Sequence, residues 1–394
     1  MQYIWAGTIA DFLRDGQCEG ALHAKAPLWA EHLGLLRAQL GQVEASVRKG
    51  GGIAFGVELF GGLKAPCVLL LGNKVVALDL LPEGTAESAR YGYCDRMVDV
   101  ARALALCHAP TRGRKTFSCV MPLGYRQNPG RNGMGNIFAP ERLGGYLALN
   151  CKEGGEAGLS DWLAAPCEDR MELLRERIGA LQSLWSERFF EGFQRDSTEI
   201  LGKLSNLGYR VYATADMEHA RAYCRARYEG REASYGFIVS SESRNMLEYG
   251  APRGAKAIRI PTPEDAVWQR NYFEDPSSPD YCTTFKRACT EHMAGGRSLD
   301  YAILGWGDDI RWSGKWKGRG MLSKEMEKKE LEEMGTSFRT YSLNPGGFAR
   351  GARNEAYATL MKLPLDGFVV FVRVSTYDGA AHRALGRFGI PITF

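Results

Sequence analysis

Short apolar runs separated by turn residues dominate the first part of the chain. A helix is expected first, because Thr8 can cap the segment "IADFLRD" that follows it. Three apolar runs then predict a β-meander, and a segment of helical spacing and one more strand complete the pattern. These segments are "IAFGVELF", "APCVLLLG", "KVVALDLL", the helical "ESARYGYCDRMVDVARALALCHA" and the strand "KTFSCVMPL". The pattern predicts an α/β domain with one sheet over residues 1–165.

The pattern changes twice after this domain. Residues 166–207 carry apolar residues at three- and four-residue spacing, which predicts a helical linker. From residue 208 to 394, apolar runs alternate with helical segments, such as "YRVYAT" before "DMEHARAYCRARY". Strands separated by helices predict a mostly parallel sheet covered on both faces. The sequence therefore predicts an α/β protein with a second α/β domain after the linker.

Composition narrows the class of protein without indicating a function. The 394 residues are 45% hydrophobic and 24% charged, which is typical of globular proteins, and no apolar stretch is long enough to span a membrane. The start of the chain lacks the features of a secretory signal, and the ten cysteines form no CxxC pairs. These features favour a cytoplasmic protein with reduced thiols and no membrane partner.

The nearest approach to a metal-ligand set is Cys282, Cys289 and His292. A structural metal site normally combines two such pairs, and a second pair is absent here. If the three residues share one helix, they are more simply one or two buried thiols and a surface imidazole. We therefore expect no metal at this position.

The clustering of cations indicates a possible partner more clearly than the net charge of +4 does. Glycine- and proline-rich loops carry arginines, and the segment "RWSGKWKGRG" interleaves cations with two tryptophans. Cations beside exposed aromatic faces are used to follow a nucleic-acid backbone and to stack on its bases. The predicted contacts are Arg126, Arg131, Arg311, Trp312, Lys315, Trp316, Lys317 and Arg319. A solvated loop whose tryptophans pack inward fits the same pattern equally well.

Two adjacent acids, Asp308 and Asp309, follow the apolar run of residues 301–305. A strand that delivers carboxylates to its tip can hold Mg²⁺ near a phosphate. An ATPase of this kind also needs the pattern GxxxxGK[ST], whose amides and lysine hold the phosphates, and the sequence contains no such motif. We therefore interpret the two acids as surface groups or as partners of Arg311.

Three segments resemble a known family. "GGRSLDYAILGWGDDIRW" and "RNEAYATLMKLPLDGFVVFV" are similar to the last domain of a bacterial superfamily-one helicase group related to the Schlafen helicases. "VELFGGLKAPCVLLLGNKVVALDLL" is similar to the N-terminal domain of that group. The resemblance implies a restriction-endonuclease-like domain over residues 1–165 and a single RecA-like domain over 208–394. The first motor domain, which would carry the phosphate-binding loop, is missing, and the helical linker stands in its place.

The nuclease motif implied by this resemblance is incomplete, because other residues replace most of its metal-binding and catalytic groups. Such nucleases hold Mg²⁺ with an acid on one strand and an acid-x-lysine on the next. The corresponding positions are Pro66-Cys67 and Asp79-Leu80-Leu81. A thiol is a poor ligand for Mg²⁺, and a leucine can neither orient water nor stabilise negative charge. The resemblance therefore implies a nuclease fold without nuclease activity.

The motor motif departs from the family in the same way. Gly295 and Ser298 stand where the family has a glutamine and a glutamate. Ala358 and Leu363 stand where it has arginines that reach the γ-phosphate, and Lys362 is a shorter substitute. Lys362 could complete the ATPase site of a partner protein in trans.

These features favour a catalytically inactive nuclease- and helicase-like accessory subunit that needs no cofactor. We expect it to bind nucleic acid, or an active motor or nuclease partner, and the resemblance places it in a bacterial anti-phage defence complex. The alternative is a divergent Mg²⁺-dependent nuclease. It would use Glu58 and Asp79 with a displaced lysine such as Lys64 or Lys74.

Overall fold

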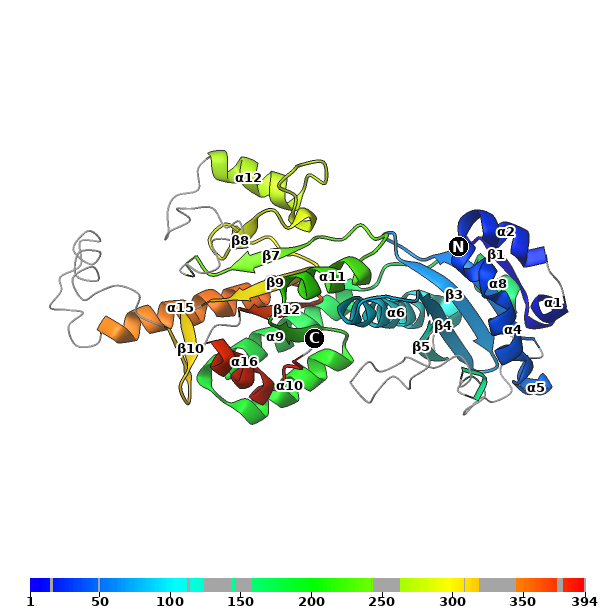
Figure 1. Cartoon of the computed structure of the whole chain (residues 1–394), viewed down its shortest axis with the longest axis horizontal. Coiled ribbons are helices and arrows are strands. Elements are labelled where there is room, and N and C mark those ends of the chain that lie inside the picture. Colours follow the sequence, from blue (N-terminus) through cyan, green and yellow to red (C-terminus); the bar gives the residue numbers. More distant parts are fainter. Residues whose placement is uncertain are drawn as a thin grey trace. The chain divides into compact units, whose positions relative to one another are not determined.

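The computed structural model divides into two compact units (Figure 1). Unit 1 comprises Met1–Leu173 and Ala222–Glu232, and unit 2 comprises Leu174–Arg221 and Ala233–Phe394. The structure describes residues 1–14, 17–48, 50–111, 114–123, 143–145, 147, 158–241, 243, 263–307, 309–318, 345–373 and 378–392. Within this part of the chain, no helix combines the length and apolar character that crossing a membrane requires.

Unit 1 is built on a five-stranded mixed sheet. Its strands, in spatial order, are β1 (Trp5–Thr8), β2 (Gly52–Glu58), β3 (Lys64–Leu71), β4 (Lys74–Leu81) and β5 (Lys115–Pro122). Neighbouring strands are antiparallel except for β4 and β5, which run parallel. The predicted meander β2–β3–β4 is confirmed. Strand β1 was not predicted, because a strand of four residues at a sheet edge shows almost no periodicity.

Helices cover both faces of this sheet. On one face, Phe55, Leu69 and Leu78 share a core with Phe12 of α1 and Leu36 of α4. That face is covered by α1 (Ile9–Arg14), α2 (Gln17–Lys25), α3 (Pro27–Glu31) and α4 (Leu33–Gly41), with α5 (Ala45–Arg48) after them. The other face packs on α6 (Glu87–Cys107) and α8 (Leu159–Ala164). The predicted cap is present, since the Asp11 amide donates to Thr8 Oγ1 at 3.0 Å.

Unit 2 contains an all-parallel five-stranded sheet, as a RecA-like domain does. In spatial order its strands are β6 (Arg210–Thr214), β12 (Gly367–Val372), β9 (Tyr301–Trp306), β7 (Tyr235–Val239) and β8 (Ala288–Thr290). The central strands β9 and β12 are buried along their whole length, as continuous apolar runs in a covered parallel sheet should be. The predicted α/β fold class is confirmed for both units.

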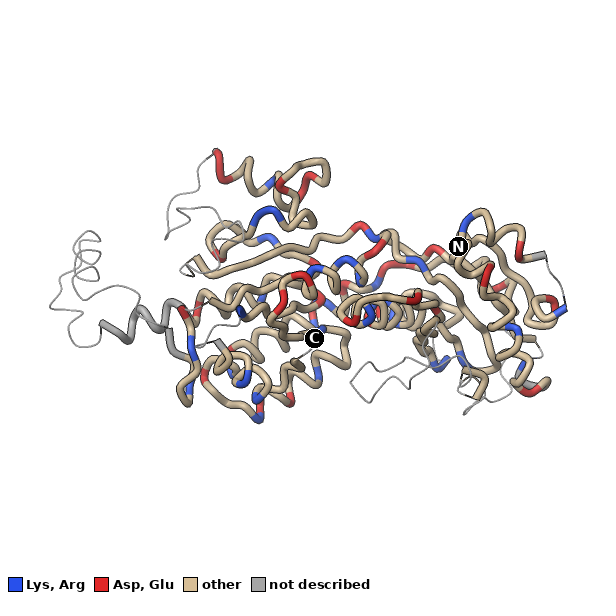
Figure 2. The backbone as a smooth tube through the Cα atoms, in the orientation of Figure 1, with Lys and Arg blue, Asp and Glu red and all other residues tan. Residues whose placement is uncertain are grey.

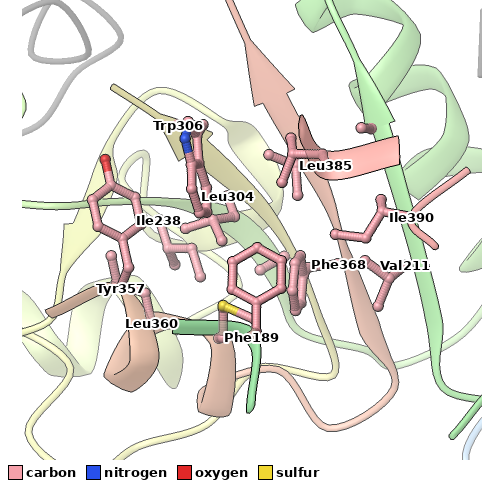
Figure 3. Packing of buried hydrophobic residues seen from close by; sticks show 14 of the residues in the cluster. Phe189, Val211, Ile238, Leu304, Trp306, Tyr357, Leu360, Phe368, Leu385 and Ile390 are labelled. Carbon is pink, nitrogen blue, oxygen red and sulfur yellow. The ribbon is translucent and has the colours of Figure 1, made fainter. Parts of the chain in front are cut away.

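Helices and a hairpin complete unit 2. The helices are α9 (Glu172–Glu191), α10 (Gln194–Asn206), α11 (Met217–Arg227), α12 (Pro263–Phe273), α15 (Pro345–Lys362) and α16 (Asp378–Arg387). The hairpin consists of β10 (Ile310–Trp312) and β11 (Trp316–Gly318). Figure 3 shows Phe189 of α9 and Leu385 of α16 in one core with Phe368 of β12. Helix α11 supplies its last residues, from Ala222 onward, to unit 1.

Cys282, Cys289 and His292 do not share one helix. Cys282 lies in a short 3₁₀ helix (Cys282–Thr284) and Cys289 in β8, and both thiols are buried. His292 is exposed. In the part of the chain that the structure describes, no cluster of three or more acidic, cysteine or histidine side chains could hold a metal ion.

Candidate functional site

The hairpin β10–β11 positions the first group of predicted nucleic-acid contacts. Its turn closes through a hydrogen bond from the Ser313 amide to the Lys315 carbonyl at 3.0 Å, and Gly314 adopts a φ of +78° that favours glycine. The side chains of Arg311 and Lys315 are exposed, and Trp312 is half-buried. The hairpin therefore presents two cations and part of one indole to solvent.

Trp316 does not share this exposure. Its ring is 2% exposed and stacks on Phe189, with ring centroids 5.2 Å apart and planes at 16°. It also contacts Trp306 of β9 edge-on at 5.0 Å. Trp316 therefore belongs to the core of unit 2, and the prediction that it offers a free face for base stacking is corrected. The inward-packing alternative describes this tryptophan.

Helix α16 adds two cations that the sequence analysis missed. Phe388, the residue after the helix, packs edge-on against Trp312 with ring centroids 5.1 Å apart, and α16 itself contacts β10. Arg383 and Arg387 lie one helical turn apart on α16, and both are exposed. The spacing in "AAHRALGRF" was the signal that could have identified them. Figure 2 shows Lys and Arg positions on both the hairpin and α16.

We call this group the basic surface: Arg311, Trp312 and Lys315 of the hairpin, together with Arg383 and Arg387 of the adjacent helix α16. Among the described residues, none of the four cations takes part in an ion pair or a side-chain hydrogen bond. Within that part of the chain, their charges are therefore not paired with an acid. Such a surface suits a polyanion, because each phosphate contact releases a counterion.

The other predicted contacts cannot be placed. Arg126, Arg131 and Arg319 lie outside the described residues. Lys317 is opposite Arg311 in the β10–β11 ladder, but its side chain is not among those described. These four residues stay predictions from the sequence.

The acid at the tip of β9 is buried rather than at the surface. Asp309 is 0% exposed and accepts hydrogen bonds from Ser240 Oγ at 2.9 Å and from the Tyr357 hydroxyl at 2.7 Å. The same hydroxyl accepts a hydrogen bond from the Gly307 amide at 3.0 Å. Burial, and then the Asp309 charge, raise the pKa of Tyr357, which keeps this hydroxyl a donor. Our interpretation of Asp309 as a surface acid was wrong; Asp308 lies outside the described residues.

The two acids of the alternative nuclease hypothesis have separate partners. Asp79 of β4 faces α6, where its Oδ2 lies 2.6 Å from Nη2 of Arg96. Glu58 ends β2, is half-buried and pairs with Lys64 at 2.7 Å. Lys74 is buried at the start of β4, and its ammonium donates to the Leu147 carbonyl at 3.3 Å. The hydrogen bonds and ion pairs in the described chain thus do not join either lysine to Asp79.

Two of the motor-motif positions, Lys362 and Gly295, lie in segments that precede the strands β12 and β9 in the chain. Lys362 is exposed at the last residue of α15, before β12 begins. Gly295 has a φ of +57°, and a Cβ placed on it would lie 2.4 Å from Nε2 of Gln269. Position 295 therefore has no room for a side chain unless Gln269 moves.

Comparison with known proteins gives one match. A family model described as Schlafen group 3, DNA/RNA helicase domain, matches residues 176–373, which is half of the chain. The search of curated proteins and the search of solved structures found no match.

Proposed function

The chain belongs to the Schlafen group 3 DNA/RNA helicase domain family, and on this premise we propose that it is a helicase-like accessory protein that binds nucleic acid without hydrolysing phosphate bonds. The observation that carries the proposal is the basic surface of unit 2. The hairpin carries two exposed cations and a half-buried indole there, and the adjacent helix α16 carries two more exposed cations.

The chemistry of this surface favours single-stranded nucleic acid. Guanidinium and ammonium groups contact phosphates whatever the base sequence, and an indole edge or face can stack on an unpaired base. In a duplex the bases are already stacked on each other, so Trp312 would have no base to contact. Single-stranded DNA or RNA is therefore the substrate class that uses all five groups.

Three features support the absence of catalysis. The sequence lacks the glycine-rich lysine motif that cradles nucleotide phosphates. Asp309 is enclosed and engaged by two hydroxyl groups. Asp79 is engaged by Arg96, and nothing in the described geometry favours the alternative Mg²⁺-dependent nuclease with Glu58 and Asp79.

The test is a binding titration of the full chain with fluorescein-labelled single-stranded DNA and RNA, followed by fluorescence anisotropy. Arg383→Gln with Arg387→Gln should weaken binding and reduce the slope of log K against log salt by up to about 1.4, since each lost contact with a single strand removes about 0.7. Lys286→Gln, an exposed cation elsewhere in unit 2, is the control and should leave both unchanged. No binding by the wild type, or an equal loss in the control, would refute the proposal.

The proposal includes a catalytically active protein partner, a motor or a nuclease, within an anti-phage complex. Lys362 is exposed at a helix end and can reach a phosphate on a second protein. ATP hydrolysis by a purified motor partner should rise when this chain is added, and Lys362→Ala should remove the rise. Equal stimulation by the variant would exclude Lys362 from that role.

A further inference from the structure

Asp79 and Glu229, which we call the acid pocket of unit 1, already hold a cation that is part of the protein, the guanidinium of Arg96. Nη2 of Arg96 lies 2.6 Å from Asp79 Oδ2, and its Nη1 lies 2.7 Å from Glu229 Oε2. The other oxygen of Asp79, Oδ1, accepts a hydrogen bond from the Leu80 amide at 2.8 Å. Both oxygens of the Asp79 carboxylate are therefore engaged.

Arg96 is fixed from several sides. It projects from α6 with its side chain 11% exposed, and its guanidinium carbon lies 4.5 Å from the centre of the Tyr93 ring. The Tyr93 hydroxyl in turn donates to Glu229 Oε2 at 3.2 Å. The aromatic ring and the two carboxylates thus enclose the guanidinium, and Asp79 itself is only 6% exposed.

The remaining groups of the nuclease-like motif do not fit Mg²⁺. Cys67 is buried in the core on the face of the sheet opposite to α6, so its thiol does not share the Asp79 pocket. Burial, and secondarily the Asp79 charge, raise the pKa of this thiol and keep it protonated. Leu81 packs on the same face as Asp79 and offers no donor. Of this motif only the Asp79 carboxylate offers oxygen ligands, so a divalent ion would also need the Glu229 carboxylate, and Arg96 engages both.

Displacing Arg96 with a metal ion would be unfavourable. The guanidinium remains charged at every physiological pH, so a metal ion that took its two carboxylates would leave a buried cation without a partner. Its two fork nitrogens already provide the directed contacts that a metal would make with the same oxygens.

We infer that Arg96 is a built-in counter-cation of Asp79 and Glu229, which closes the acid pocket of unit 1 to divalent metal ions. The inference rests on the proposed non-catalytic function and gives its structural cause in this unit. In this arrangement Arg96 does what a metal would otherwise do, which is to join strand β4, helix α6 and residue Glu229.

The test measures Mn²⁺ binding to the full chain by electron paramagnetic resonance, with circular dichroism to check folding. Wild type and Asp79→Asn should bind the same amount of Mn²⁺. Arg96→Met should gain a site that fills below about 1 mM, the range of weak oxygen-ligand sites, and the double variant Arg96→Met with Asp79→Asn should lose it. Arg102→Met, another arginine of α6 that contacts an aspartate, is the matched control and should gain no site.

Two results would overturn the inference. One is Mn²⁺ bound by the wild type and lost in Asp79→Asn, a comparison that does not depend on whether Arg96→Met folds. The other is a folded Arg96→Met chain that gains no site. Because these measurements contain no nucleic acid, failure of the proposed binding function would leave their outcome unchanged.

Discussion

Nε and Nη2 of Arg227 donate to the two carboxylate oxygens of Asp99, at 3.1 and 3.3 Å, and the two residues are 1% and 7% exposed. Arg231 also contacts Asp99, at 3.3 Å. Burial alone would raise the pKa of Asp99, but Arg227 and Arg231 together with Arg102 hold it below its usual value. This cluster fastens residues 222–232 to helix α6 within unit 1.

Removing one partner of this buried pair should be costly. Arg227→Ala leaves the Asp99 charge in a desolvated site, so we expect the free energy of unfolding to fall by about 3–5 kcal/mol. Urea denaturation of the full chain measures it. Lys203→Ala, which breaks the exposed pair with Glu199, is the control and should cause no measurable change. Equal effects of the two substitutions would contradict the role given to Arg227.

Replacing two helical glycines by alanine should change the stability of the chain in opposite directions. A Cβ on Gly92 of α6 would lie 2.5 Å from the Tyr223 carbonyl oxygen, whereas a Cβ on Gly179 of α9 would meet nothing within 4 Å. Gly179→Ala should stabilise the chain by about 0.5–1 kcal/mol, because alanine favours the helix. Gly92→Ala should destabilise it by forcing α6 away from residues 222–232. Thermal unfolding of both variants checks this, and stabilisation by Gly92→Ala would show that the close approach is absent.

Substitutions of the two hairpin tryptophans should have different effects: loss of Trp316 should mainly lower stability, and loss of Trp312 should weaken the binding of a single strand. Trp316→Ala opens a cavity beside Phe189 and is expected to lower the free energy of unfolding by about 3–5 kcal/mol. Trp312→Ala should cost less stability and reduce the free energy of single-strand binding by about 1–3 kcal/mol. Urea denaturation and anisotropy titration on the same preparations measure both. Unaltered binding by Trp312→Ala would show that Trp312 does not stack on a base.

A buried imidazole makes the stability of unit 1 depend on pH. His108 is 0% exposed, with Nε2 at 2.9 Å from the Trp162 carbonyl oxygen and Nδ1 at 2.7 Å from Thr111 Oγ1. Burial lowers the pKa of His108, and Arg114 acts in the same direction. Below about pH 6.5, His108 therefore binds a proton in the unfolded chain but stays neutral in the folded chain. The free energy of unfolding should fall as the pH drops.

Melting temperatures between about pH 7.5 and pH 5.5 test this. The His108→Gln variant should have a lower melting temperature than the wild type at pH 7.5. Its melting temperature should fall less than that of the wild type when the pH is lowered. Burial also lowers the pKa of His382 in unit 2, so part of the pH dependence should remain in this variant. An unchanged fall in melting temperature would show that other groups control it.

The sequence predicted features that depend on neighbouring residues in the chain. The Thr8 cap and strands β2 to β4 follow from local chemistry and periodicity, and both are present. Burial by distant partners was not predictable in this way. Trp312 and Trp316 face each other in one hairpin, yet only Trp316 is buried, because Phe189 lies beneath it.

The side-chain partners of the buried acids Asp309 and Asp79 could not be predicted either, because they are distant in the sequence. Nothing near Asp309 in the sequence indicates that Ser240 and Tyr357 will enclose it. Likewise, Asp79, Arg96 and Glu229 come from separate segments, and only the fold brings them together. The loss of catalytic groups stays a prediction from the sequence, and the position of Arg96 beside Asp79 could not be predicted in the same way.

The most direct test of the account is the fate of a labelled single strand in the presence of Mg²⁺. A strand of about 30 nucleotides, longer than the usual binding site of a single module, is incubated with saturating protein and analysed on native and denaturing gels. The account predicts a strand that is shifted on the native gel and remains intact on the denaturing gel. A strand cut in an Mg²⁺-dependent reaction that Asp79→Asn abolishes would contradict it, as would a strand that is never shifted.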